Sequence, residues 1–176
     1  FRRRWELYFY AGECEAGLKN YDAALTWYER ATKAARKSRE RADAIRRTGD
    51  ALVAAKRYDE AQAVYAECLK VEDRGGRRLD LALKRGGALQ DLKRFDEALS
   101  FYESWKGHAL AEKRDGEVYL RIDECMALTG RVKEAIEGYG KIVTQFPRTS
   151  AAYEAQFRIG YLYESQLGDL DAAGRE

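Results

Sequence analysis

The stretch YDAALTWYERA (residues 21–31) returns in altered form three times, as YDEAQAVYAEC (58–68), FDEALSFYESW (95–105) and VKEAIEGYGKI (132–142). Each copy begins 37 residues after the one before it. A catalytic site is normally built once, from unlike residues, whereas a phrase repeated at a fixed interval is typical of a structural unit that stacks on copies of itself. The sequence therefore predicts a repeat protein.

The repeated stretch has the spacing of a helix that packs through one face. In every copy an alanine is followed four residues later by a tyrosine, which places both side chains on the same helical face. The small alanine lets a neighbouring backbone approach, and the ring fills the space one turn later. The pairs are Ala24/Tyr28, Ala61/Tyr65, Ala98/Tyr102 and Ala135/Tyr139.

Another helix is predicted before each copy, separated from it by a short turn. Glycines recur in it at Gly12, Gly49, Gly86 and Gly160, and Asp123 takes this place in the fourth unit. A glycine in a helix interior costs about 1 kcal/mol relative to alanine. We therefore expect these positions to mark close contact between helices.

This pattern resembles the tetratricopeptide repeat (TPR) family, whose signature joins a Gly-x-x-Tyr first helix to an Ala-x-x-x-aromatic second helix and a closing proline. The resemblance implies an all-α fold, a right-handed superhelical solenoid of antiparallel helix pairs, and no enzymatic activity. It covers nearly the whole chain. The matching first-helix positions are Gly49/Leu52, Gly86/Leu89, Gly160/Tyr163, Tyr8 and Tyr119, and the proline is Pro147.

The expected organisation is one array of four helix pairs and a truncated fifth, in what we expect to be a fragment of a longer protein. The period is 37 instead of the family's usual 34, so some helices or loops should be longer. We expect a second helix that continues through Ser38 over residues 31–47, and a loop at Gly75–Gly76. The expected bounds are about 3–39, 40–76, 77–113, 114–149 and 150–176.

In the TPR family the first helix of each pair lines a concave binding surface, so we compared the first helices at the 37-residue period. One row is acidic (Glu6, Asp43, Asp80, Glu117, Glu154), and a second row, four residues on, is basic in four units of five (Tyr10, Arg47, Lys84, Arg121, Arg158). A third row is Glu13, Asp50, Gly87, Glu124 and Tyr161, and a largely apolar row is Phe9, Arg46, Leu83, Leu120 and Phe157.

These rows support two interpretations that stay open. An acid four residues before a base is a favourable ion pair on a helix, and stacked units would extend such pairs into a ladder with a structural role. The same bases would also set the register of an acidic partner peptide or helix, with the apolar row holding it. The predicted binding residues are Phe9, Tyr10, Arg46, Arg47, Leu83, Lys84, Leu120, Arg121, Phe157, Arg158 and Tyr161.

The sequence gives little support to catalysis, a cofactor or a metal. His108 is the single histidine, and no phosphate-binding loop or His-x-x-x-His pair is present. Three isolated cysteines argue against a disulfide framework or a zinc site. The net charge of +2 and the lack of a long apolar run argue against a polyanionic partner and a membrane span.

Two rival functions remain, and the compartment is open. Residues 30–47 hold eight basic residues near Trp27, which would suit nucleic acid, although the acidic row would repel a phosphate backbone. An uncovered apolar seam at Ala172–Ala173 would allow self-association. Lone thiols favour the cytoplasm, whereas residues 145–173 resemble repeats of bacterial cell-envelope proteins and keep the periplasm open.

Overall fold

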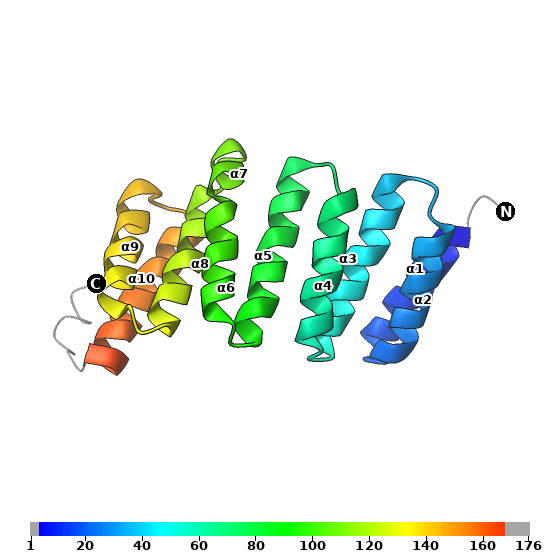
Figure 1. Ribbon diagram of the computed structural model, residues 1–176, viewed down its shortest axis with the longest axis horizontal. Helices are drawn as coiled ribbons and strands as arrows, with labels where there is room; N and C mark the ends of the chain where they lie inside the picture. The colour runs from blue at the N-terminus through cyan, green and yellow to red at the C-terminus, as the bar shows by residue number, and fades with distance from the viewer. Residues whose placement is uncertain (1–3, 168–176) are drawn as a thin grey trace. The chain divides into compact units, whose positions relative to one another are not determined.

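The computed structural model describes residues 4–167, which are helical throughout apart from short connections and contain no strand (Figure 1). This confirms the all-α prediction. The elements are α1 (Arg4–Gly17), α2 (Tyr21–Ala34), α3 (Ser38–Ala54), α4 (Tyr58–Val71), α5 (Gly75–Asp91), α6 (Phe95–Ser104), α7 (Lys106–Ala111), α8 (Asp115–Leu128), α9 (Val132–Gln145), α10 (Ser150–Leu162) and the short π-helical η1 (Tyr163–Leu167).

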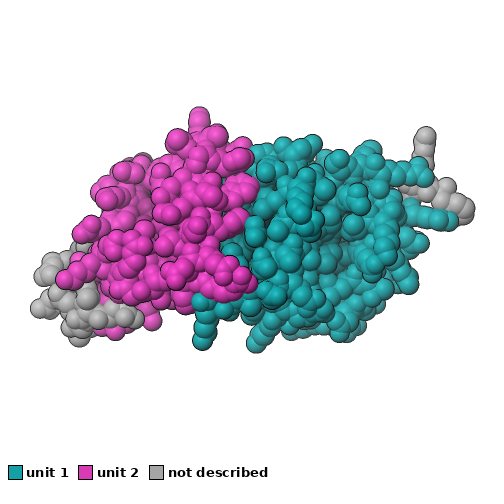
Figure 2. Space-filling view, viewed as in Figure 1, with its two compact units in different colours: residues 1–93 teal, residues 94–176 magenta. Residues whose placement is uncertain are grey.

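The chain divides into two compact units, coloured separately in Figure 2. Unit 1, Phe1–Lys93, contains α1 to α5, in which each helix packs against the next. Unit 2, Arg94–Glu176, contains α6 to η1, with α8 packed against α6, α7 and α9, and α9 packed against α10. The division falls inside the predicted third pair, so that α5 belongs to unit 1 and α6 to unit 2.

The turn inside each helix pair closes the first helix in a defined way. The amide of Asn20 donates to the carbonyl of Glu15 and that of Lys19 to Ala16, and Arg57 repeats the first bond to Leu52. This is the Schellman pattern, which needs a left-handed residue. Lysine fills that place at Lys19 and Lys56, with φ of 64° and 59°.

The predicted glycine seams are present in unit 1. A Cβ atom on Gly12 would collide with the ring of Tyr28, and one on Gly49 would collide with the ring of Tyr65. Both rings are buried, with 1% of their surface exposed. The glycines are therefore needed for the two helices of each pair to approach closely.

In the fourth repeat the small residue lies on the second helix of the pair instead of the first. Asp123 occupies the glycine position on α8 and is buried, with 7% of its surface exposed. The facing residue on α9 is Gly138, where a Cβ atom would collide with the Asp123 carboxyl group. The missing side chain on α9 therefore makes room for the added one on α8.

Two local predictions are wrong. A continuous helix over 31–47 does not form, because Ala35 and Lys37 are extended and the Glu40 carboxylate accepts the amide hydrogen of Lys37 as α3 starts. The loop expected at Gly75–Gly76 lies earlier, at residues 72–74, and α5 begins at Gly75. There the buried Glu72 accepts hydrogen bonds from both the backbone and the guanidinium of Arg74.

Two of the three cysteines, Cys68 and Cys125, are buried, and Cys14 is exposed. The seam expected at Ala172–Ala173 lies outside the described residues. Within residues 4–167, no helix has the length and apolar character needed to cross a bilayer.

Candidate binding face on the first helices

A depression of about 470 Å³ lies on unit 1 between α3 and α5. It is lined by Arg46, Arg77, Asp80, Leu83 and Lys84. Three of these are predicted binding residues, Arg46 and Leu83 from the apolar row and Lys84 from the basic row, and the structure brings them together. The lining combines three cations and one acid with an apolar side chain.

Beside this depression runs a chain of ion pairs, which we call the ladder (Glu13, Arg47, Asp50 and Lys84). Arg47 Nη2 lies 2.8 Å from Glu13 Oε2, and Lys84 Nζ lies 2.8 Å from Asp50 Oδ1. Arg47 also reaches Asp50 within its own helix, at 3.7 Å. The ladder therefore links α1, α3 and α5, as one of the two interpretations of the sequence expected.

Two buried tyrosines of the repeated phrase donate hydrogen bonds to the acids of the ladder. The Tyr28 hydroxyl donates to Glu13 over 2.5 Å, and the Tyr65 hydroxyl donates to Asp50 over 2.8 Å. Burial, together with the neighbouring carboxylate, raises the pKa of both tyrosines well above the usual value. The phenols therefore stay protonated as donors, and the acids are fixed where a base of the next helix pair can reach them.

Unit 2 contains the same kind of contact between α8 and α10. Arg158 Nη2 lies 2.9 Å from Glu124 Oε1 and 2.8 Å from Glu154 Oε1, and Arg121 Nη1 lies 2.8 Å from Glu124 Oε2. Burial alone would lower the pKa of Arg121, but the hydrogen bond to Glu124 and the negative charges of Glu124 and Glu154 together outweigh burial, and the pKa is raised. The predicted bases of this unit are therefore charged and held by acids.

The partners of the bases differ in part from the expected ones. The predicted pair four residues apart forms at Glu154 and Arg158. The other predicted bases, Arg47, Lys84 and Arg121, pair with acids of the third row, Glu13, Asp50 and Glu124. Sequence reasoning missed Arg77, which pairs with Asp43. The signal was present as a base 34 residues after an acid, a spacing shared by Glu13/Arg47, Asp43/Arg77, Asp50/Lys84 and Glu124/Arg158.

The apolar row does not form one exposed surface. Leu120 is buried, with 4% of its surface exposed, because α9 and α10 pack over it, so the prediction that it contacts a partner is wrong. Phe9 is half-buried and stacks on Trp5, with ring centroids 4.8 Å apart. Phe157, in contrast, is 73% exposed, and Tyr161 on the same helix is also exposed. In unit 1, Tyr10 on α1 is exposed as well.

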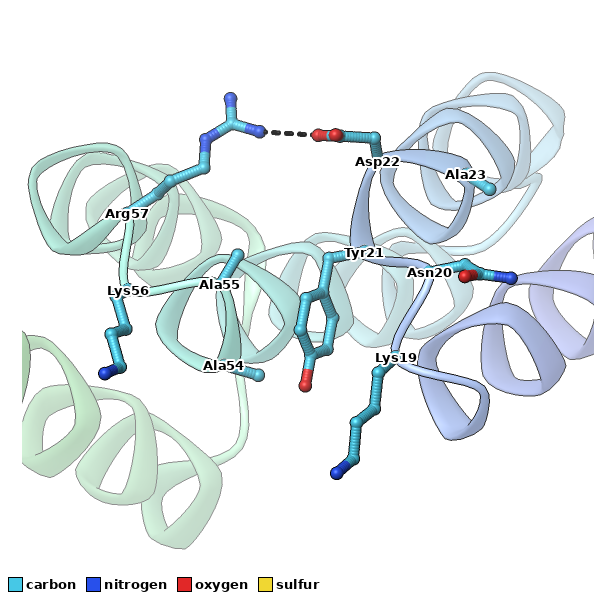
Figure 3. Close-up of a pocket in the computed structure, with 9 residues that line it drawn as sticks. All are labelled: Lys19, Asn20, Tyr21, Asp22, Ala23, Ala54, Ala55, Lys56 and Arg57. Carbon is cyan, nitrogen blue, oxygen red and sulfur yellow. Dashed lines mark hydrogen bonds and ion pairs between the residues drawn. The ribbon is translucent and has the colours of Figure 1, made fainter.

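A separate pocket of about 660 Å³ lies at the turns of the first two helix pairs (Figure 3). The ring of Tyr21 projects into it between Lys19 and Lys56, and Arg57 Nη1 lies 3.1 Å from Asp22 Oδ1 along its rim. The sequence did not predict this pocket, which forms between two successive turns and the start of α2.

The remaining candidates for chemistry lie apart from these surfaces. His108 is exposed on α7, and its nearest described ring is Trp105, 4.8 Å away. Burial raises the pKa of the Cys68 thiol to about 12, so this thiol is a poor nucleophile. Among residues 4–167, no three histidine, cysteine or acidic side chains gather as a metal site.

Four of the eight basic residues in segment 30–47, considered above for nucleic acid, pair with acids within the protein. Lys33 pairs with Glu29 and Arg39 with Asp43. Arg47 belongs to the ladder, and Arg46 lies 3.2 Å from Asp50. Because these cations already have acidic partners, the segment does not present a continuous phosphate-binding surface.

Comparison with known proteins identifies the repeat. A sequence profile described as tetratricopeptide repeat matches residues 1–39 and 46–115. A comparison with curated protein sequences found no significant match.

Several solved structures are similar across nearly the whole chain. MamA (residues 41 to the end) from Desulfovibrio magneticus RS-1 has a TM-score of 0.73 and 17% identity over 98% of this chain and 90% of its own. YrrB, described as a TPR protein with an unusual peptide-binding site, has a TM-score of 0.61 and 21% identity over 94% and 79%. At these identities the likeness shows the shared fold, the helical-repeat solenoid of TPR proteins.

A third similar structure is larger. The Rap conjugation gene regulator of the plasmid pLS20, solved in complex with the Phr* peptide, has a TM-score of 0.70 and 15% identity over 97% of this chain. This chain spans about half of that protein, 50% of its length.

Proposed function

Because the chain belongs to the tetratricopeptide repeat family, a family of protein-interaction repeats, we propose that it is a non-catalytic scaffold that binds a peptide or helix of a partner protein along its first helices. The observation that carries this proposal is the depression lined by Arg46, Leu83 and Lys84 on unit 1. Peptide binding in two structures of the same fold, YrrB and the Rap regulator, supports the choice of ligand class.

The lining favours an acidic partner segment with an apolar side chain. Three cations, Arg46, Arg77 and Lys84, line this depression beside one acid, Asp80. The cations also pair with acids next to the depression, Arg46 and Lys84 with Asp50 and Arg77 with Asp43. Lys84 is 41% exposed in its side chain, and an ammonium group can donate three hydrogen bonds, of which Asp50 takes one. A partner carboxylate would share these donors, while Leu83 would contact an apolar side chain beside it.

The ladder supports the proposal by holding these cations in place before a partner arrives. Fixing a long side chain at an interface costs roughly 0.5–1.5 kcal/mol. Here the tyrosine–acid–base contacts already restrict Lys84 through Asp50 and Tyr65. The ladder interpretation and the binding interpretation are therefore compatible, because the same ion pairs stabilise the stack and orient the donors.

Unit 2 has residues of the same kinds on α8 and α10. The guanidinium groups of Arg121 and Arg158 both pair with Glu124, and α10 also carries the exposed Phe157 and Tyr161. We assign these residues to the partner-binding set, together with Tyr10 and the exposed edge of Phe9 on α1.

The test is a binding measurement with designed helical peptides. A fluorescein-labelled peptide with leucine at every third or fourth position and glutamate between is compared with its lysine counterpart by fluorescence anisotropy. The glutamate peptide should bind and the lysine peptide should not. Arg46→Gln with Lys84→Gln should weaken binding of the glutamate peptide about tenfold or more.

The matched control removes two charges from the same unit outside the depression. Lys56→Gln with Lys93→Gln changes two exposed turn lysines and should leave affinity within about twofold. Far-UV circular dichroism verifies that both double variants stay folded. Equal loss in the two variants would mean general electrostatic attraction and would contradict the proposed face.

A second candidate function, self-association, is favoured by one residue on α1. Leu7 is 66% exposed, whereas the residues at the same place in the later repeats are 0–1% exposed. We propose that the outer face of α1 is covered by a helix of a second copy. The equivalent residues are Ala44, Leu81, Val118 and Ala155.

Sedimentation velocity over a wide range of protein concentration tests this second candidate. Wild-type protein should show a concentration-dependent rise in sedimentation coefficient, and Leu7→Asp should remain monomeric. Leu110→Asp, which changes a leucine of 65% exposure on α7, serves as the control. A monomer at all concentrations of wild type would contradict self-association through α1.

A further inference from the structure

A pocket of about 780 Å³ lies at one end of unit 1, between α1, α2 and the connection that joins α2 to α3. It is distinct from the depression on α3 and α5 and shares no residue with it. Ligand pockets for small molecules or short peptide segments fall in this size range. The residues that matter for its chemistry are Trp5, Tyr8, Arg30, Lys33, Arg36 and Lys37.

The aromatic wall of this pocket is held by contacts within the protein. The Trp5 indole N–H donates to the carbonyl of Glu40 over 3.1 Å, and its ring stacks on Phe9. Tyr8 stacks on Trp27, with ring centroids 5.9 Å apart. These rings are fixed without a ligand, so a ligand that packs against them would lose little free energy to ordering the wall.

The rim of the pocket is cationic. The guanidinium of Arg30 lies over the Trp27 ring, 4.7 Å from its centroid, which places its charge beside the aromatic wall. The backbone amides of Arg36 and Lys37 both donate to the Glu40 carboxylate, at 2.9 and 3.3 Å, which fixes the connection that carries them. Within residues 4–167 neither of these two side chains forms an ion pair, and both are exposed.

The pocket also contains acceptors. Glu6 and Glu40 belong to its lining together with the cations. A nucleotide offers dense negative charge to such a lining, and the two carboxylates would repel it. A peptide offers carboxylates for the cations and backbone N–H groups for the glutamates, so its mixed chemistry matches the mixed lining.

We propose that this pocket binds an acidic peptide segment that carries an aromatic residue. The aromatic side chain packs against Trp5 and Tyr8, and acidic side chains of the segment pair with Arg36 and Lys37. This site is independent of the face on α3 and α5, and a protein with both sites would hold a partner at two points of one unit.

The experiment uses a fluorescein-labelled peptide with four glutamates around one phenylalanine, too short to form a helix. Wild-type protein should bind it saturably, and Arg36→Gln with Lys37→Gln should weaken binding at least tenfold. The control, Arg39→Gln with Arg41→Gln, removes two exposed charges from the start of α3 outside the pocket and should change affinity less than twofold.

A second readout locates the peptide. Trp105 lies in unit 2, so in a Trp105→Phe background the remaining indoles are Trp5, which lines the pocket, and Trp27, which stacks on the lining residue Tyr8. Unlabelled peptide should change their emission along the same saturation curve. The variant Arg46→Gln with Lys84→Gln should bind this peptide as the wild type does. A failure of the pocket proposal can therefore be distinguished from a failure of the proposed binding face on α3 and α5.

Three results would overturn the proposal. The first is no saturable binding by wild type, and the second is equal loss of affinity in the pocket and control variants. The third is displacement of the peptide by adenosine monophosphate at a comparable concentration, which would assign the pocket to nucleotides.

Discussion

Asp123 makes the stability of unit 2 depend on pH. The carboxyl group is buried between α8 and α9, and among the described residues it accepts no hydrogen bond and forms no ion pair. Burial raises its pKa from 3.8 to about 7, although Lys141 on α9 and Lys106 on α7 act in the opposite direction. Lys106 is itself shared with Glu103, 3.5 Å away.

The sign and size of the effect follow from this rise. An acid whose pKa is raised on folding binds more protons in the folded state between the two pKa values, so the free energy of unfolding falls as pH rises from about 4 to about 7. A rise from 3.8 to about 7 is about three pH units, and at 1.36 kcal/mol per unit it corresponds to about 4 kcal/mol above pH 7. Relaxation and water entry reduce this, so we expect about 2–4 kcal/mol.

The perturbation is Asp123→Asn, which has nearly the same shape and does not titrate, measured by urea unfolding from pH 4 to pH 8.5. A Trp5→Phe and Trp27→Phe background leaves Trp105 as the reporter of unit 2. The free energy of unfolding of the variant should equal that of the wild type near pH 4 and exceed it by about 2–4 kcal/mol at pH 8. The contributions of the other titrating groups are the same in both proteins and cancel in the comparison.

The control for this prediction is Glu137→Gln, which removes an exposed acid from α9. It should give a small difference that does not vary with pH. A difference between wild type and the Asp123 variant that is constant across the range, or that grows toward low pH, would refute the reasoning.

Three further predictions concern the stability and reactivity of the repeats. Gly49→Ala should destabilise unit 1 by about 1–3 kcal/mol, because the methyl group would overlap the facing tyrosine ring, whereas Gly87→Ala, which meets nothing within 4 Å, should stabilise it by about 0.5–1 kcal/mol; urea unfolding of both variants checks this. Glu72→Gln should lower the free energy of unfolding by about 1–3 kcal/mol by weakening the clamp of the 72–74 loop, and an unchanged midpoint would contradict that role. One thiol, Cys14, should react with Ellman's reagent in the native protein, and unfolding should release the two buried thiols, Cys68 and Cys125.

Much of the fold could be predicted because the repeat fixes it. The Ala-x-x-x-Tyr spacing and the recurring glycines indicate which faces meet. Gly12 and Gly49 mark close contact between helices as expected, and the groups they lie against are the rings of Tyr28 and Tyr65. The connections between helices were harder to predict, because each depends on a few capping contacts. Lys37 and Glu40 stop a helix that composition alone would continue.

The sequence predicted which residues of the candidate site occupy equivalent positions in the repeats, but it did not predict which of them are buried. The period placed Arg46, Leu83 and Lys84 on comparable helices, and they line one depression. Leu120 shares the row of Arg46 and Leu83 but lies under α9 and α10, because burial depends on the neighbouring helices and not only on position within the repeat. The pocket beside Trp5 was not foreseen, since its residues come from two helices and a connection whose course depends on Glu40.

The most direct test of the central claim is to map the contact of the glutamate helical peptide by backbone amide chemical shifts in the ¹⁵N-labelled protein. The account predicts that the largest changes fall on α3 and α5 around Arg46, Leu83 and Lys84. Changes confined to α2 and α4, the second helices of unit 1, or no saturable change at all, would contradict it.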